Sequence, residues 1–215
     1  MSVPFGTRSL FIGCSDDKQF GGILKLLQEL NGSPGSHLLL WRGVPTDLSR
    51  RRVLQRVLIS GHGSPTQAGF ELGSVQELKP CDLRLPGNAG LYLMGCYQGR
   101  KQQRLTWAAG TGVDSNRVWG CAGETESALS TCLLLHLLDE GADSIDRWFP
   151  LWIRANDALR PHFPTIREVY ARRGADPLAA LADLKAAGNL DALFREFDEF
   201  LAVITRRPAY LTDLI

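Results

Sequence analysis

Two residues with complementary chemistry, His62 and Cys96, each follow a short apolar run. The run 56–60 leads to His62, and the run 91–95 leads to Cys96. Short apolar runs bounded by glycine are typical of buried strands in a parallel sheet, and ligands bind just beyond the carboxyl ends of such strands. A thiol and an imidazole presented there are the parts of a cysteine nucleophile with its acid–base partner.

Glycines near His62 and Cys96 would leave backbone N–H groups accessible, and a thiol nucleophile needs such groups to stabilise negative charge. Gly63 directly follows His62, and Gly99 lies three positions after Cys96. We expect Gly99 to open a helix, whose unpaired N–H groups would favour the thiolate form of Cys96. The N–H groups of Gly63 and Cys96 could form an oxyanion hole, in which each donor typically supplies ~2.7–4 kcal/mol. His62 would protonate the leaving amine.

Composition limits the class of protein. The 215 residues carry a formal net charge of +1, which gives no overall basic surface for nucleic acid. No run approaches the ~18 apolar residues of a membrane span, and residues 1–8 lack a secretory signal pattern. Five cysteines without a Cys-x-x-Cys pair argue against a disulfide framework and a cysteine-type zinc site. We expect a cytoplasmic protein without a metal or other cofactor, and with no nucleic-acid or membrane partner.

Strands and helices alternate up to about residue 163. The pattern predicts strands at 9–13, 37–41, 56–60, 91–95 and 118–120, and helices at about 23–30, 46–55, 101–109, 125–140 and 145–159. A small hairpin is predicted within 67–73, where glycines bound an alternating segment. This alternation predicts an α/β fold with a mainly parallel central sheet covered on both faces.

Beyond Pro164 the pattern is helical only. Helices are predicted at about 177–187 and 190–205, and in the last of these the apolar residues recur every three or four positions. The expected organisation is therefore a domain over residues 1–163 and a helical C-terminal extension over residues 164–215 that packs on it.

The order of the two residues along the chain separates the known classes of thiol enzyme. A glutamine amidotransferase elbow reads Gly-x-Cys-x-Gly with its histidine after the cysteine, and papain-like enzymes also place the cysteine first. Here Gly95 is adjacent to Cys96, and His62 precedes it by 34 positions. Both alternatives are therefore disfavoured.

The paired motifs resemble those of the caspase-like (clan CD) cysteine peptidases. An apolar strand ending in Ser-Gly-His-Gly, a small hairpin and an apolar strand ending in Gly-Cys-x-x-Gly are most similar to CHAT-domain proteases, with metacaspases as the next resemblance. The likeness covers about Ser9 to Leu159. It implies a caspase-like three-layer α/β/α sandwich in which His62 and Cys96 form the catalytic dyad. It also implies that the N–H groups of Gly63 and Cys96 form the oxyanion site.

The same resemblance implies where the substrate side chain would bind. The loop after the first strand lines the pocket for the residue before the cut, and it carries Asp16 and Asp17 here. Ser60 matches a pocket serine of metacaspases, whereas Met94 stands where metacaspases have an aspartate. The two aspartates predict a preference for arginine or lysine before the cut, and Met94 argues against it because it supplies no second charge.

Together these observations predict a cysteine endopeptidase that cleaves a polypeptide substrate through a Cys–His dyad. A regulatory or activating protein partner is compatible with this prediction. The alternative is a catalytically silent caspase-like module that serves in binding or as a scaffold. A solvent-accessible, reactive Cys96 would separate the two.

Overall fold

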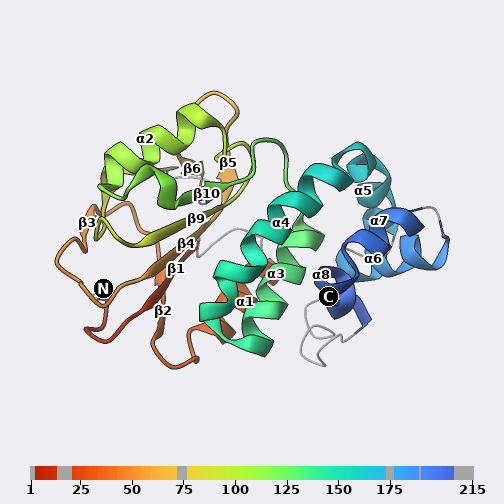
Figure 1. The fold of residues 1–215 in the computed structure, drawn as a ribbon, viewed down its shortest axis with the longest axis horizontal. Helices are drawn as coiled ribbons and strands as arrows, with labels where there is room; N and C mark the ends of the chain where they lie inside the picture. Colours follow the sequence, from red (N-terminus) through yellow and green to blue (C-terminus); the bar gives the residue numbers. More distant parts are fainter. Residues whose placement is uncertain (1–2, 14–20, 72–76, 173–176, 189, 206–215) are drawn as a thin grey trace. The chain divides into compact units, whose positions relative to one another are not determined.

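The computed structural model describes residues 3–13, 21–71, 77–172, 177–188 and 190–205. The chain forms two compact units, Met1–Glu124 and Thr125–Ile215. In the described part of the chain, all strands belong to the first unit and the second is helical (Figure 1). The sequence placed the boundary at 163/164, so two helices assigned to the first domain belong to the second unit.

The first unit is built on a five-stranded sheet. Its strands are β1 (Ser9–Gly13), β2 (Ser36–Leu40), β4 (Arg56–Ser60), β9 (Gly90–Met94) and β10 (Val118–Gly120). They lie in the order β10-β9-β4-β1-β2, and every neighbouring pair is parallel. The predicted α/β fold with a mainly parallel central sheet is confirmed. The strand order reverses between β1 and β4, and in doubly wound sheets that point is where a ligand-binding crevice opens.

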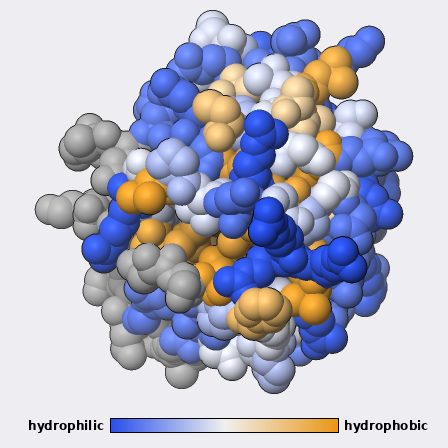
Figure 2. All heavy atoms as spheres, turned by 90° about the vertical axis from the view of Figure 1, so that its left-hand side faces the viewer, coloured by the Kyte–Doolittle hydropathy of each residue, from blue (hydrophilic) through white to orange (hydrophobic). Residues whose placement is uncertain are grey.

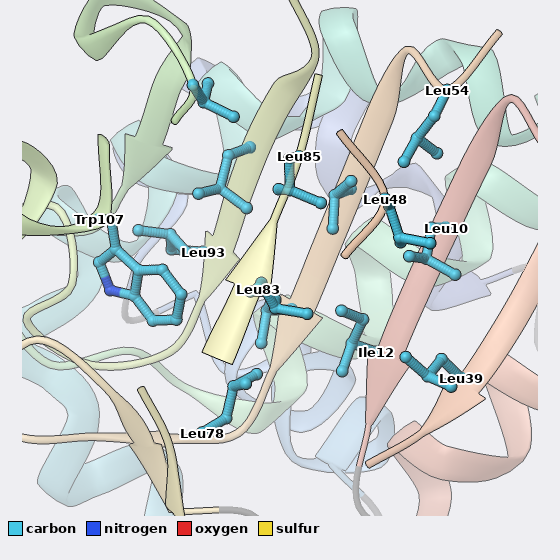
Figure 3. Packing of buried hydrophobic residues seen from close by; sticks show 14 of the residues in the cluster. Leu10, Ile12, Leu39, Leu48, Leu54, Leu78, Leu83, Leu85, Leu93 and Trp107 are labelled. Atoms are coloured by element: carbon cyan, nitrogen blue, oxygen red, sulfur yellow. The ribbon is translucent and has the colours of Figure 1, made fainter. Parts of the chain in front are cut away.

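Alternating side chains give the sheet two apolar faces. One face forms a buried cluster with α2 (Lys101–Thr111), and Trp107 of α2 lies beside Leu93 in Figure 3. The strand residues of this cluster include Leu10, Ile12, Val57, Ile59, Leu91 and Leu93. α1 (Gly21–Leu30) packs on β1 and β2 through an amphipathic face that buries Ile23, Leu26, Leu27 and Leu30. Both helices were predicted, and α2 extends two residues further than expected before Gly112 ends it with a φ of 82°.

Two small sheets lie beside the main one. β3 (Thr46–Asp47) pairs in parallel with β8 (Leu83–Arg84), and a 3₁₀ turn, η2 (Pro80–Asp82), precedes β8. β5 (His62–Gly63), β6 (Phe70–Glu71) and β7 (Glu77–Leu78) form an antiparallel sheet. The hairpin expected within 67–73 is found only in part, because β6 lies in that range whereas its partners β5 and β7 lie outside it, and β5 contains His62 itself.

The predicted helix over residues 46–55 is wrong. This segment begins as β3 and continues as turns. The carboxylate of Asp47 accepts hydrogen bonds from the Ser49 N–H at 2.9 Å and from the Ser49 hydroxyl at 2.6 Å. Such local bonds compete with helix formation, and the pairing of β3 with β8 then fixes the segment as a strand.

The second unit consists of helices joined by short turns. They are α3 (Ser127–Glu140), α4 (Ile145–Leu159), α5 (Phe163–Arg172), α6 (Pro177–Ala186), α7 (Asp191–Glu196) and α8 (Asp198–Leu201), with the 3₁₀ turns η4 (Ala142–Ser144), η5 (Arg160–His162) and η6 (Ala202–Thr205). α6 and α8 pack on α3. The sequence predicted one helix over 190–205, but it breaks at Phe197, whose φ and ψ of −109° and 23° are not helical.

The exposed apolar residues of the first unit are dispersed. Phe5 and Val44 are the most exposed of them, at 84% and 65%. The guanidinium of Arg51 lies 4.6 Å from the centre of the Phe5 ring. On the face drawn in Figure 2, hydrophilic side chains interrupt the apolar areas. Single exposed apolar side chains of this kind are ordinary for a protein surface.

Candidate functional site

The strands that precede His62 and Cys96 are hydrogen-bonded neighbours. β4 pairs with β9 from Arg56 opposite Gly90 to Ser60 opposite Met94. Every partner in this register is 34 positions further along the chain, which is also the separation of His62 from Cys96. Beyond the last pair, the Gly61 N–H donates to the Met94 carbonyl at 3.4 Å. The sheet therefore delivers His62 and Cys96 to the same place at its carboxyl edge, as the sequence predicted.

The backbones of the two segments touch after the strands end. A Cβ on Gly63 would lie 2.0 Å from the carbonyl oxygen of Cys96, far inside the contact distance. A Cβ on Gly95 would lie 2.5 Å from the carbonyl oxygen of Gly61. Each position therefore excludes any side chain. The motif glycines are required because they let the histidine segment and the cysteine segment pack directly against each other.

His62 and Cys96 are more exposed than most of the other described histidines and cysteines. His62 is exposed and Cys96 is half-buried, so reagents and substrates can reach both. Cys121 and Cys132 are buried, whereas Cys81 is exposed on the η2 turn. Cys96 is thus one of two described cysteines within reach of solvent, and the one that lies beside a histidine segment.

The residue after Cys96 has an unusual backbone conformation. Tyr97 has a φ of 63°, the one positive φ among the described residues other than glycine. This conformation costs on the order of 1–3 kcal/mol and persists only where the surroundings enforce it. Its N–H donates to the Gly123 carbonyl at 2.8 Å, and its hydroxyl donates to the Glu124 carboxylate at 3.2 Å. The guanidinium of Arg100 lies over its ring, 4.7 Å from the centre.

Burial and the Glu124 carboxylate together raise the pKa of the Tyr97 hydroxyl. The phenol therefore remains protonated over the physiological range and keeps donating to Glu124. These contacts hold the sharp turn at Tyr97 in place. Because of this turn, the residue before it, Cys96, is half-buried, whereas the residue after it, Gln98, is fully buried.

Gln98 is a central residue of the site that the sequence analysis did not identify. Its side chain is fully buried. The carboxamide oxygen accepts hydrogen bonds from the Gly69 N–H at 3.1 Å and from the indole N–H of Trp107 at 2.8 Å. The carboxamide nitrogen faces the carbonyls of Ser64, Gln67 and Cys96 at 3.3–3.5 Å. No sequence signal indicates this role, because all but one of these partners are backbone groups.

The helix after Cys96 starts later than expected. Arg100 is the N-cap and α2 begins at Lys101, so Gly99 does not open it. The Gly99 N–H instead donates to the Cys121 carbonyl at 2.8 Å. A Cβ on Gly99 would lie 1.9 Å from the Gly120 carbonyl oxygen, so Gly99 is required for packing against the end of β10. Its N–H is therefore not directed at the Cys96 thiol.

Of the four residues predicted to line the substrate pocket, one lines a cavity, one is buried beside it and two lie outside the described residues. Ser60 is buried and lines a small cavity of about 10 Å³ at the point where the strand order reverses. The other lining residues are Gly13, Ile23, Leu24, Leu27, Gly61 and Glu71. Met94 is buried at the end of β9, directly opposite Ser60. Asp16 and Asp17 lie outside the described residues.

Glu71 is an acidic residue that lines this cavity, and the sequence analysis did not single it out. It lies directly opposite His62 in the antiparallel β5–β6 pair. Directly opposite residues point to the same face of a sheet, so the Glu71 and His62 side chains share the outer face of the hairpin. The inner face carries Phe70 and Leu78, which are fully buried.

Comparisons with protein-family models, with curated proteins and with solved structures give no match for this chain. In the described part of the chain, no three His, Cys, Asp or Glu side chains cluster as metal ligands would. None of the described helices is both long enough and apolar enough to cross a membrane.

Proposed function

We propose that this chain is a caspase-like cysteine endopeptidase of the CHAT type that uses Cys96 as nucleophile and His62 as acid–base partner. One observation carries the proposal: the β4–β9 register and the close approach of Gly63 to the Cys96 carbonyl bring the backbone beside the exposed His62 against that of the half-buried Cys96. A cytosolic location is part of the proposal, because an odd number of cysteines without a Cys-x-x-Cys pair fits a reducing compartment.

In this reaction His62 takes the proton of the Cys96 thiol, and the sulfur attacks the carbonyl carbon of the scissile peptide bond. The carbonyl oxygen takes up the negative charge, which the N–H groups of Gly63 and Cys96 stabilise. His62 then gives a proton to the leaving amine, the C–N bond breaks and an acyl-enzyme remains. His62 next removes a proton from a water molecule, which attacks the acyl carbon and breaks the C–S bond. The carboxylic acid is released, and His62 returns the proton to the Cys96 sulfur.

The residue before the cut is proposed to be arginine or lysine. The proposal rests on Asp16 and Asp17 from the sequence, and Glu71 supports it because this acidic residue lines the cavity beside Ser60. A carboxylate next to apolar walls favours a cationic side chain with an aliphatic stem and penalises an acidic one. Met94 supplies no charge to this region.

A second candidate function is a catalytically silent module that binds a protein partner. The size of the cavity beside Ser60 favours it, since about 10 Å³ admits roughly one water molecule and no substrate side chain without movement. The same experiment distinguishes the two functions.

The test is digestion of a peptide library by the full-length chain and by Cys96→Ala and His62→Ala. We expect wild type to cleave after arginine or lysine, and each variant to lose at least ~10³-fold in kcat/KM with a nearly unchanged unfolding temperature. Cys81→Ala is the matched control and should cleave like wild type. Cleavage that survives Cys96→Ala would contradict the proposal. Absence of any cleavage, with an unreactive Cys96, would favour the silent module.

Asp16→Ala, Asp17→Ala and Glu71→Gln separate the sources of specificity. Matched peptides should carry Arg, Lys, Leu or Asp before the cut. Loss of cleavage after arginine with cleavage after leucine retained identifies the carboxylate that binds the substrate cation. A wild-type preference for aspartate or leucine would exclude the basic specificity while leaving the dyad untouched.

A further inference from the structure

We infer that Gln98 is a positioning residue that holds the segment of His62 against the segment of Cys96. The inference rests on the proposed function, because it concerns the geometry of that dyad. It assigns a specific task to a neutral, fully buried side chain that does not itself touch the reacting atoms.

The orientation of the Gln98 carboxamide is fixed by its surroundings. Two N–H donors, from Gly69 and from the Trp107 indole, point at one end of it. Three carbonyl oxygens lie at the other end. Exchanging the oxygen and nitrogen would set donor against donor and acceptor against acceptor, so a single orientation of the carboxamide is compatible with these groups.

The carboxamide links three separate parts of the first unit. Trp107 belongs to α2 and lies in the core cluster, where its ring also packs at 5.6 Å from that of Phe70. Ser64, Gln67 and Gly69 belong to the loop that connects β5 to β6, directly after His62 and Gly63. The third part is Cys96 itself, whose carbonyl faces the same nitrogen at 3.5 Å.

The loop after His62 depends on side chains for its shape. Between Gly63 and Phe70 it forms no strand or helix, and its carbonyls accept bonds from side chains of the segment 98–103. Arg100 and Gln103 both donate to the Pro65 carbonyl, at 2.9 and 3.2 Å. Gln98 binds the same loop and also reaches the Cys96 carbonyl. It therefore couples the position of the loop to the position of the nucleophile.

Packing at Gly63 strengthens this coupling. A Cβ on Gly63 would lie 2.9 Å from both Cγ and Nε2 of Gln98, so the residue next to His62 rests directly on the Gln98 side chain. The turn at Tyr97, with its φ of 63°, allows Gln98 to point into the core while Cys96 stays at the surface. A displacement of about 1 Å between reacting groups can cost ~100-fold in rate, so a tether at this point has catalytic consequences.

The experiment is a double-mutant cycle on the reactivity of Cys96, measured without any turnover. Iodoacetamide labelling of Cys96 is followed by peptide mass spectrometry in full-length wild type, His62→Ala, Gln98→Met and the double variant. In wild type we expect His62→Ala to slow labelling of Cys96 about tenfold. In the Gln98→Met background the effect of His62→Ala should fall below about twofold, because the Gln98 carboxamide no longer holds the loop after His62 to the Cys96 segment.

Two controls separate positioning from general stability. Labelling of the exposed Cys81 in the same samples reports any global change. Gln103→Met removes another buried glutamine that binds the same loop, and it should retain the tenfold effect of His62. A role for Gln98 in stability alone would lower the unfolding temperature and leave that effect intact, which would overturn the inference and leave the proposed dyad standing.

The remaining outcomes also decide the question. If His62→Ala does not change labelling of Cys96 in wild type, the dyad fails, and the inference fails with it. If Gln98→Met does not fold, Trp107→Phe replaces it, since this change removes the indole N–H and keeps a ring against Phe70. Trp107→Phe should reduce the effect of His62, and an undiminished effect would overturn the inference.

Discussion

The molecule contains two sets of cysteine and histidine, and their surroundings are opposite. Cys132 and His136 lie on α3 at a spacing of four, which places them on one face of the helix. His62 and Cys96 are 34 positions apart and meet through the pairing of two strands. By spacing alone, the pair on the helix is the more obvious one.

The pair on α3 is unsuited to catalysis. Burial raises the pKa of the Cys132 thiol to about 12 and lowers the pKa of His136. A ring nitrogen of His136 lies 2.8 Å from the Phe200 carbonyl, and the imidazole stacks on Trp148 with the ring centres 3.6 Å apart. This histidine is a packed core residue. The comparison shows that a cysteine and a histidine close together are not enough for a catalytic site. The two side chains must also lie where solvent and substrate can reach them, as at the carboxyl edge of the sheet.

Thiol labelling gives the largest expected difference between the two pairs. At pH 7, Cys132 should react with iodoacetamide on the order of a thousandfold more slowly than the exposed Cys81, because so little of it is thiolate. Cys96 should react roughly tenfold faster than Cys81 although it is less exposed, if His62 activates it. Peptide mass spectrometry over a time course measures all three. Faster labelling of Cys81 than of Cys96 would show that His62 does not activate Cys96, and the contrast between the two pairs would fail.

Alkaline unfolding gives the next largest effect. The Cys132 pKa is raised in the folded state, so the folded state holds its proton while the unfolded thiol ionises above about pH 8.5. Stability is therefore lost as the pH rises. Between pH 7 and pH 10 this group should remove about 2 kcal/mol from the free energy of unfolding. Urea titrations of wild type and Cys132→Ala should show the stability difference between them shift by that amount in favour of the variant. A stability difference that does not change with pH would show that the pKa of Cys132 is the same in the folded and unfolded states.

Acid unfolding gives the smallest effect and tests His136. Its pKa is lowered in the folded state, chiefly by burial, so below about pH 6.5 the unfolded chain binds a proton that the folded chain resists. Stability therefore falls as the pH falls, by at most about 1.4 kcal/mol per pH unit. His136→Gln keeps an N–H donor for the Phe200 carbonyl and cannot titrate. Urea titrations between pH 7.5 and pH 5 should show a shallower loss for the variant, and equal slopes would refute this account.

Elements with strong periodicity could be predicted from the sequence. The five strands of the main sheet and helices α1, α2, α3 and α4 follow from apolar runs and amphipathic patterns bounded by glycine. The segment 46–55 could not, because the pairing of β3 with β8 and the bonds of Asp47 to Ser49 override a weak helical pattern. The break of the last helix at Phe197 lies inside an unbroken apolar stripe, so the pattern gave no sign of it.

The candidate site was predictable only where strands carry it. His62 and Cys96 follow apolar runs, and the adjacent glycines mark a close approach of backbones. Gln98 makes its bonds mainly to backbone carbonyls and N–H groups that are distant in the chain, and these leave no trace in residue types. The positive φ of Tyr97 is likewise unmarked, since glycine or asparagine would be the usual residue there. Sequence patterns indicate which residues are buried, but they give little indication of which side chains form hydrogen bonds with the main chain.

The register between β4 and β9 has a consequence for how the chain can change. The pairing of β4 with β9, and not the length of the intervening chain, sets the separation of His62 from Cys96. An insertion or deletion in the exposed turn at Gly87 and Asn88, between β8 and β9, would therefore leave the two residues side by side. A slip of one residue between the strands would instead turn one of them to the opposite face. The turn at Gly87 and Asn88 is therefore open to variation in length, whereas the paired strands can exchange side chains but cannot gain or lose a residue.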